Sequence, residues 1–322
     1  MALGEVVVCS GGLRVAQRGV RTAAGVPGLQ VVGISIVTPP DSLAVEARRS
    51  DEVVWRRHWL DGNRLVIEFV DVALVQVEDT GEVIFDRVLP TEMEQHLLFD
   101  HVLPLVLARD GALVLHGGVI SRAGEGAVLV GSPGAGKSTF AAFAWQHGWT
   151  VGGDDGSVLF ATDPPGVEPT YATLRLTPAS VELLGVDPTT TSTVVGKMRV
   201  AGEGSRAFRQ ERVALRTIAI IEPVGDGEDA RFERLRGIDA HAELFGSTFH
   251  AELSGDRLLP AIVDDLASIV ERTTVGRLAM PRGLDGLAAA ERLLRAVVDD
   301  AHGSDRRATP AHHRGDTTKP ER

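Results

Sequence analysis

The sequence predicts an α/β fold with a P-loop-containing core and a smaller β-rich N-terminal lobe. Two observations predict the core and the lobe: a glycine-rich phosphate-binding motif over residues 131–139, set between a strand-like and a helix-like run, and short β-branched runs over residues 64–89. A chain of 322 residues with 43% hydrophobic residues can bury one large core or two modest ones. We expect an N-terminal lobe over 1–105, a P-loop domain over 106–301 and a disordered tail over 302–322.

Charge and composition limit the partners of the chain. A formal net charge of -11, from 44 acidic and 33 basic residues, argues against a broad surface for nucleic acid or anionic membrane. Apolar runs stay short of the roughly 20 residues that a membrane helix needs. The single cysteine, Cys9, has no internal disulfide partner, and the N-terminus contains Glu5 and no basic region before a long apolar stretch. We therefore expect a cytoplasmic protein with no nucleic acid and no membrane partner.

The N-terminal lobe is expected to be an antiparallel sheet. Runs 65–70, 73–77 and 83–85 are rich in apolar and β-branched residues, and the last two flank an Asp-Thr-Gly turn. Residues 91–107 then carry apolar residues at helical spacing, which predicts a helix that bridges the lobes, and Pro104 should end or bend it.

The core should start with a strand, a phosphate loop, a helix and a second strand. Gly148 is placed as the left-handed C-cap of the helix. The expected elements are a strand over 112–115, a turn at Gly117-Gly118, a strand over 127–130, a helix over 137–147 and a strand over 149–151.

Further along the chain, loops alternate with apolar runs. Prolines and glycine at 163–168 and threonines at 187–196 predict surface loops, and we expect loops 163–170 and 187–204 to set acceptor specificity. Residues 213–222 predict a strand, and 264–271 and 286–299 predict helices. The tail over 302–322 has too few large apolar residues to offset the entropy of ordering.

Residues 131–139 fit the G-x-x-x-x-G-K-S/T (Walker A) pattern between a strand and a helix, as the motif requires. Glycines let successive N–H groups and the helix N-terminus face the phosphates, while Lys137 reaches the β/γ oxygens and Ser138 ligates magnesium. A plain glycine turn does not account for this combination. The sequence therefore predicts binding of ATP and Mg²⁺ by Gly131, Ser132, Pro133, Gly134, Ala135, Gly136, Lys137, Ser138 and Thr139.

Two adjacent carboxylates, Asp154 and Asp155, follow the strand at 149–151, and an adjacent parallel strand would bring them near the P-loop. Asp154 is the candidate magnesium ligand, and Asp155 is the candidate acceptor of a proton from an attacking hydroxyl. The alternative is an Asp-Gly turn that closes a hairpin.

His116 ends the strand at 112–115 and precedes two glycines that permit close approach of another group. It could contact a phosphate or orient an acid, although a lone histidine at a strand end is often structural. Four other histidines lack metal-ligand spacing with a cysteine, so no zinc site is predicted; they are His241, His250, His312 and His313.

His116, Lys137 and the Asp154-Asp155 pair resemble, in type and spacing, the catalytic domain of HPr kinase/phosphorylase, whose fold is similar to that of phosphoenolpyruvate carboxykinase. In that family the second aspartate accepts the proton. Among HPr-kinase-related enzymes, the chain looks most like those found beside lasso-peptide genes, which phosphorylate a serine of the precursor peptide. The likeness lies in the Leu-His-Gly-Gly-Val-Ile sequence around His116 and in residues 174–178.

The resemblance covers roughly residues 111–185 with specific motifs and extends by pattern through 280–284. In the family, a glycine-rich segment supplies a glutamate to magnesium. This chain has no convincing counterpart of that segment, although Glu182 lies in the approximate region. That departure argues against a phosphorylase reaction and against HPr as the substrate. Lys197 and Arg199 could clamp phosphates or belong to a solvated basic loop. The family forms rings, so the resemblance allows a homo-oligomer.

The leading functional prediction is transfer of the γ-phosphoryl group of ATP to a hydroxyl, on a serine of a peptide or protein substrate, with Asp155, His116 and Lys137 as catalytic residues. One alternative is a nucleotide-gated binding module or ATPase that transfers no phosphate to an acceptor. Another is a small-molecule kinase. A carboxykinase-like reaction is disfavoured because a second set of metal and oxaloacetate ligands is missing.

Overall fold

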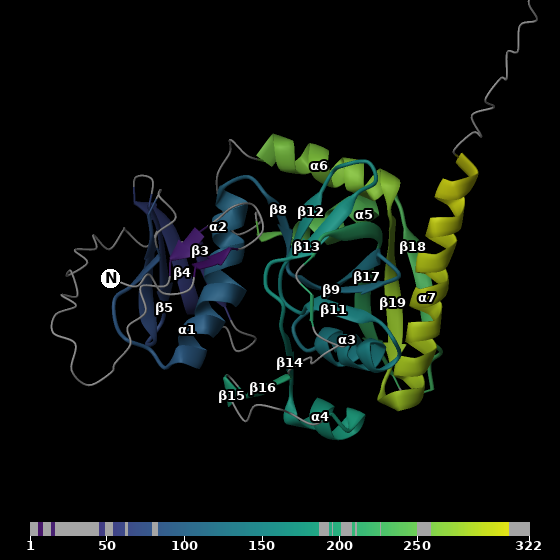
Figure 1. The fold of residues 1–322 in the computed structure, drawn as a ribbon, viewed down its shortest axis with the longest axis horizontal. Coiled ribbons are helices and arrows are strands. Elements are labelled where there is room, and N and C mark those ends of the chain that lie inside the picture. The colour runs from purple at the N-terminus through teal and green to yellow at the C-terminus, as the bar shows by residue number, and fades with distance from the viewer. Residues whose placement is uncertain are drawn as a thin grey trace, which may run out of the picture.

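The computed structural model describes residues 6–8, 14–16, 45–48, 54–61, 64–78, 83–186, 193–194, 196–200, 208–209, 211–225, 227–249 and 259–308. Within these residues the strands form a nine-stranded sheet, a five-stranded sheet and two small sheets of three and two strands. Figure 1 shows the five-stranded sheet on one side of the molecule, α1 and α2 beside it, and the nine-stranded sheet with its helices on the other side. The chain is a mixed α/β protein, as the sequence predicts.

The five-stranded sheet is antiparallel throughout, as expected for the N-terminal lobe, and its order is β3-β4-β5-β6-β7. Alternate residues of β5, such as Leu65, Ile67 and Phe69, are buried on one face and share a hydrophobic core with the helical segment that follows the sheet. The strands are β3 (Val45–Arg48), β4 (Val54–Asp61), β5 (Arg64–Phe69), β6 (Ala73–Val77) and β7 (Val83–Phe85). A separate hairpin joins β1 (Val6–Val8) to β2 (Arg14–Ala16).

The helical bridge does not end at Pro104. It runs as α1 (Thr91–Leu97), a π-helical turn η3 (Leu98–Val102) and α2 (Leu103–Arg109). Proline has no N–H to donate, and its ring crowds the carbonyl four residues earlier, so it fits poorly inside a regular helix. Here Pro104 falls in the first turn of α2, directly after the wider π turn, where a missing N–H is tolerated.

The nine-stranded sheet positions the candidate site. Strands β10, β17 and β19 lie side by side and are parallel, so their carboxyl ends share one edge, and the P-loop leaves β10 at that edge. β13, β12 and β8 branch from the start of β17. The strands are β8 (Leu113–Leu115), β9 (Gly117–Arg122), β10 (Glu125–Val130), β11 (Thr150–Gly153), β12 (Ser157–Phe160), β13 (Gly166–Pro169), β17 (Val213–Val224), β18 (Arg231–Leu235) and β19 (Thr274–Pro281).

The predicted turn at Gly117-Gly118 is wrong, because both residues belong to β9. The reversal comes instead at Ala123 and Gly124, which have positive φ values of 52° and 82° and form a two-residue hairpin loop between paired Arg122 and Glu125. As a result β9 lies between β10 and β11. The Asp-Asp pair directly follows β11, which runs in the same direction as β10 but is not its neighbour in the sheet. The expectation of an adjacent parallel strand is therefore wrong.

The segments predicted as specificity loops are partly strands. Residues 166–169 form β13, which hydrogen-bonds to β12 and to the start of β17. Residues 193–194 form β15 (Thr193–Val194), which pairs with β16 (Lys197–Val200), and β16 pairs with β14 (Leu174–Leu176). The rest of the 187–195 stretch and residues 201–207 lie outside the described residues.

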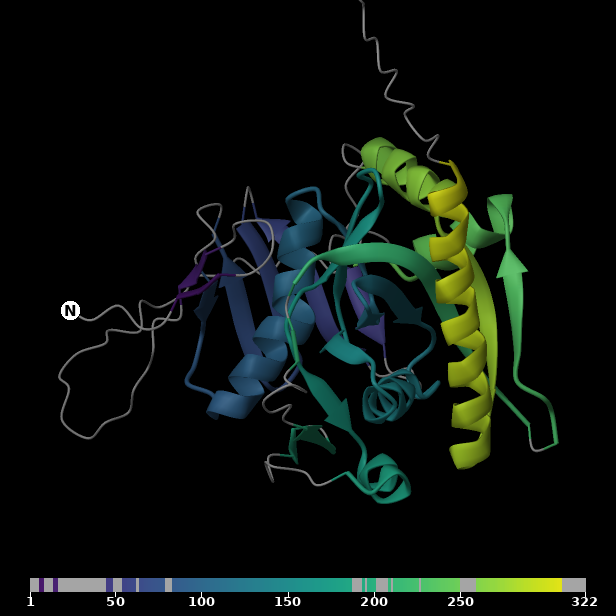
Figure 2. The same cartoon turned by 45° about the vertical axis from the view of Figure 1, so that its right-hand side comes forward.

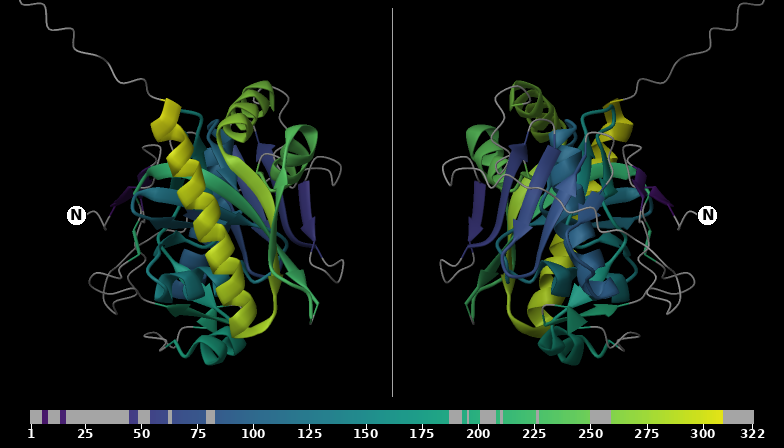
Figure 3. Two further views of the ribbon diagram at one scale, coloured as in Figure 1. Left: turned by 90° about the vertical axis from the view of Figure 1, so that its right-hand side faces the viewer. Right: turned by 90° about the vertical axis from the view of Figure 1, so that its left-hand side faces the viewer.

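Helices cover both faces of the nine-stranded sheet (Figures 2 and 3). In β10, Ala127 and Leu129 join the core under α3 (Lys137–Gln146) and α7 (Gly283–Ala308). Val128 and Val130 point the other way, into the core under α5 (Gly237–Gly246) and α6 (Leu259–Arg272). The strand predicted at 213–222 and the helices predicted at 264–271 and 286–299 are confirmed as β17, α6 and α7.

The last helix, α7, continues to Ala308 and therefore enters the segment 302–322 that was expected to be disordered, while residues 309–322 lie outside the described part of the chain. A short helix, α4 (Pro178–Leu184), follows β14. Within the described residues, each helix is too short or too polar to cross a bilayer.

Glu291 on α7 stabilises the packing of α7 beside α3. Its carboxylate is buried and accepts hydrogen bonds from Trp149 Nε1 at 2.7 Å and from Arg295 Nε at 2.9 Å. Glu291→Ala should lower the free energy of unfolding by about 1–3 kcal/mol, because a buried indole N–H loses its acceptor. Denaturant unfolding measures this, with exposed Glu271→Ala as a control expected to change stability by less than about 0.5 kcal/mol. Equal losses in the two variants would contradict the assigned role.

Candidate active site

The P-loop is held against the parallel strands by a glycine with no room for a side chain. Gly131 has a φ of 140°, and a Cβ there would lie 2.8 Å from the carbonyl oxygen of Ile221 on β17. Lys137 begins α3 and donates hydrogen bonds from Nζ to the carbonyls of Gly131 at 2.6 Å and Ser132 at 3.2 Å. Burial lowers the pKa of Lys137, against the opposing effect of Asp155. The ammonium group therefore lies inside the curl of the loop.

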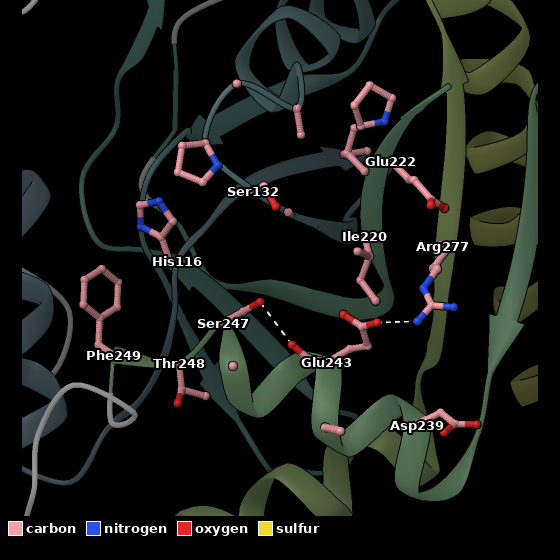
Figure 4. Close-up of a pocket in the computed structure, with 18 residues that line it drawn as sticks. His116, Ser132, Ile220, Glu222, Asp239, Glu243, Ser247, Thr248, Phe249 and Arg277 are labelled. Atoms are coloured by element: carbon pink, nitrogen blue, oxygen red, sulfur yellow. Dashed lines mark hydrogen bonds and ion pairs between the residues drawn. The ribbon is translucent and has the colours of Figure 1, made fainter. Parts of the chain in front are cut away.

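A cavity of about 950 Å³ opens beside the P-loop. Residues 131–135 line it together with the carboxyl end of β17, α5 and the residues that follow α5, and Figure 4 shows their side chains around the space. Its far wall contains the ion pair between Arg277 on β19 and Glu243 on α5. The P-loop and the ends of the parallel strands thus form one wall of a cavity large enough for a nucleotide.

Asp154 lies next to the first turn of α3. Its Oδ2 atom is 3.3 Å from Ser138 Oγ and accepts the backbone N–H of Arg175 at 2.9 Å. Its Oδ1 atom is buried without a hydrogen-bond partner among the described residues. The backbone of Asp154 can lie this close to β9 because residue 118 is a glycine. A Cβ there would lie 2.9 Å from the carbonyl oxygen of Gly153 and 3.1 Å from Asp154 Cα. A Cβ at Gly117 would likewise lie 2.7 Å from the carbonyl oxygen of Leu129, so both glycines after His116 permit close approach, as predicted.

Arg175 on β14 is a neighbour of the carboxylates that the sequence analysis did not identify as part of the site. Its side chain is 8% exposed and forms ion pairs with both Asp155 and Asp100 of the π turn. Asp100 also contacts His96 Nδ1 at 2.5 Å. Two signals in the sequence could have indicated this cluster: an arginine between two leucines in a buried strand, and the His96/Asp100 pair at i,i+4 spacing.

The two adjacent carboxylates have opposite pKa shifts. Burial and the charge of Asp155 raise the pKa of Asp154 to about 7, although Arg175 opposes the shift. Burial would also raise the pKa of Asp155, but the charge of Arg175, with smaller contributions from His116 and Lys197, lowers it to about 2. Burial lowers the pKa of Arg175, but the three surrounding carboxylates more than reverse this effect. Asp155 is therefore ionised at neutral pH, while Asp154 takes up a proton readily.

His116 lies between the P-loop cavity and a second cavity that contains Asp155, and it lines both. Its backbone N–H donates to the carbonyl of Ser247 at 2.7 Å, and its ring meets Phe249 edge-on at 5.7 Å between centroids. The fold thus brings His116 and Asp155 together at the wall of one cavity and His116 and the P-loop together at the wall of the other.

Other predicted residues lie around this centre. Thr139 Oγ1 is 2.8 Å from Ser180 Oγ, so its hydroxyl contacts α4. Lys197 lines the second cavity with Asp155, whereas Arg199 donates a hydrogen bond to Gln95 of α1 at 3.2 Å. Glu182 is exposed on α4.

The residues present fit a magnesium ion of the P-loop type. Among the described residues, three or more His, Cys, Asp or Glu side chains do not gather into a metal cluster. Ser138 and Asp154, with its unpartnered Oδ1, would supply the hydroxyl and the carboxylate that hold magnesium in P-loop proteins.

Asp154 should make the stability of the metal-free protein depend on pH. Its pKa in the folded chain, about 7, lies above its ordinary value of 3.8, so its contribution favours the folded state at low pH and is lost as pH rises from about 4 to about 7. Asp154→Asn should remove this dependence and raise the melting temperature at pH 8 in the presence of a chelator. Melting curves at pH 5.5 and pH 8 test this, and identical pH dependence in the two proteins would contradict it.

Comparisons with known proteins show a distant structural likeness. No family model and no curated protein matches the chain. Among solved structures, the chain is similar to the HPr(Ser) kinase/phosphatase from Coxiella burnetii, with a TM-score of 0.32 and 11% sequence identity, over 61% of this chain and 99% of that chain. The relationship is a distant structural one.

Proposed function

We propose that this chain is an ATP- and Mg²⁺-dependent kinase that transfers the γ-phosphoryl group to a hydroxyl, on a serine of a peptide or protein. The observation that carries the proposal is the placement of Asp155: an ionised carboxylate in a cavity that shares His116 with the cavity beside the P-loop. A simple nucleotide-binding site does not need a second cavity that contains a carboxylate and shares a histidine with the first.

Each residue has a separate task in this reaction. The N–H groups of the P-loop and Lys137 bind the β- and γ-phosphates, and Ser138 and Asp154 would hold the magnesium ion. Bound magnesium neutralises charge on the phosphate oxygens. The acceptor oxygen forms a bond to the γ-phosphorus as the bond to the β-phosphate oxygen breaks, ADP leaves, and Asp155 receives the hydroxyl proton.

A second candidate is a nucleotide-gated binding module or ATPase without phosphotransfer to an acceptor. The ion pair between Asp155 and Arg175 favours it, since a carboxylate engaged by a guanidinium is a weaker proton acceptor. For the kinase, Arg175 acts as a positioning residue that keeps Asp155 ionised and fixed.

The two candidates differ in what becomes of the labelled γ-phosphate. The kinase should transfer it from γ-labelled ATP to serine peptides in the presence of Mg²⁺, and mass spectrometry should find phosphoserine. The binding module should retain nucleotide or release free phosphate. Free phosphate as the sole labelled product, with a range of serine peptides present, would refute the kinase proposal.

Lys137→Ala tests the nucleotide part of the proposal separately. Losing the buried ammonium should weaken nucleotide turnover by at least about 100-fold, as for the loss of other single groups that stabilise developing negative charge. The exposed Arg231→Ala serves as a control for loss of a positive charge, and its turnover should match that of the unmodified protein. Unchanged turnover in Lys137→Ala would show that the P-loop lysine takes no part in the reaction.

A further inference from the structure

The cavity that contains Asp155 has a volume of about 360 Å³ and lies between the N-terminal sheet and the P-loop domain. Its lining comes from three parts of the chain: β4, β5 and the turn after β5; α1 with its π turn; and the P-loop domain. These parts face one another around α1 in Figure 1. A site built in this way exists only in the folded protein, at the junction between the two sheets.

One side of the cavity is apolar. The N-terminal sheet and its turn contribute Trp55, Phe69, Val70 and Val72, and α1 contributes Met93 and Leu97. His101 belongs to the same wall, where its ring packs edge-on against Trp55 at 4.8 Å between centroids. Burial, with a smaller effect of Arg56, lowers the pKa of His101 well below 6.5, so the ring is neutral at neutral pH. This wall therefore offers aromatic and aliphatic surface without charge.

The other side of the cavity is polar. The P-loop domain contributes His116, Asp155, Arg175 and Lys197, and Asp100 of the π turn is paired with Arg175. A hydroxyl that transfers its proton to Asp155 must lie on this side, within hydrogen-bond reach of the carboxylate. The group that carries the hydroxyl then extends toward the apolar wall.

We propose that this cavity is the acceptor subsite and that the acceptor is a serine with an aliphatic or aromatic side chain next to it, which enters the cavity and packs on Trp55, Phe69 and Met93. This deepens the proposed function and rests on it. The volume lies at the lower end of the roughly 300–1,000 Å³ of small-molecule sites, which suits one large side chain beside a hydroxyl. Burial of such a side chain should favour binding by about 10- to 100-fold.

A library of serine heptapeptides with randomised flanking residues tests the subsite. Phosphorylation by the protein with ATP and Mg²⁺, followed by mass spectrometry, should show at least about tenfold enrichment of Leu, Met, Phe or Trp at one flanking position. Val72→Trp, which fills the cavity from the partly buried turn, should remove the enrichment while leaving the Kd for Mg·ATP unchanged. Val88→Trp introduces the same side chain at a position that is 58% exposed and outside the cavity, and it should retain the enrichment.

Selection of library peptides by the immobilised protein, with Mg²⁺ and a non-hydrolysable ATP analogue, separates the subsite from the reaction. Apolar-flanked peptides that bind but are not phosphorylated would support apolar peptide binding in the cavity and overturn the proposed kinase function, and with it the acceptor role of the cavity. Phosphorylation without apolar enrichment, or enrichment that Val72→Trp leaves intact, would overturn the subsite and retain the kinase. Peptides that neither bind nor react would overturn both.

Discussion

Asp155→Asn is expected to lower kcat for phosphoryl transfer by about 10²–10⁴-fold and to leave the Kd for Mg·ATP within about threefold. The amide keeps the size of the carboxylate and can still contact Arg175, but it cannot accept the proton of the acceptor hydroxyl. Asp155 is separate from the Ser138–Asp154 pair that would hold magnesium, so nucleotide binding should survive. Single-turnover transfer and equilibrium nucleotide binding measure the two effects.

The exposed Asp229 provides the matched control, because Asp229→Asn makes the same chemical change on the surface. It should leave both transfer and binding unchanged. If Asp155→Asn transferred phosphate at the normal rate, Asp155 would not be the proton acceptor, and the acceptor subsite would lose its anchor.

Arg175→Ala is expected to have the largest effect on stability, a loss of about 3–5 kcal/mol. The guanidinium is almost fully buried and lies between Asp100 and Asp155, so its removal leaves like charges facing one another without a counterion. The backbone N–H that Arg175 donates to Asp154 remains available in the variant. Denaturant unfolding at pH 8 measures the loss.

Neutralising one partner should restore part of this stability. The double variant Arg175→Ala/Asp100→Asn should be more stable than Arg175→Ala alone, since one of the repelling charges is gone. Arg231→Ala, which breaks an exposed ion pair, should cost less than about 1 kcal/mol. A loss for Arg175→Ala no larger than that of the surface variant would mean that the cluster does not stabilise the fold.

The α/β class and much of the core could be predicted from the sequence because the signals are local. Apolar residues at helical spacing indicate α6 and α7, and the glycine-rich motif is itself a contiguous strand-to-helix connection. The hairpin between β9 and β10 also has a local signal, the Ala123-Gly124 pair. The sequence nevertheless predicts the turn at Gly117-Gly118, because two adjacent glycines are a stronger turn signal.

The remaining errors concern contacts between distant segments. No local pattern places β9 between β10 and β11, because strand order is decided by how the whole sheet packs. Likewise, in the sequence Arg175 is a single charged residue in a predicted strand. Its ion pair with Asp100 becomes apparent only in the folded chain, where the π turn places Asp100 beside it. The π turn itself arises where a helix must accommodate Pro104, which sequence rules treat as a helix end.

His116 has a consequence for the order in which substrates act. Among the described residues, His116 is the one that lines both cavities. All other lining residues belong to one cavity or the other, so the two cavities are separate spaces. In the proposed kinase, a nucleotide in one cavity and an acceptor in the other can therefore be bound at the same time. Initial-rate plots at varied concentrations of both substrates should therefore intersect, as for a ternary-complex mechanism, and an inert analogue of either substrate should inhibit without competing with the other.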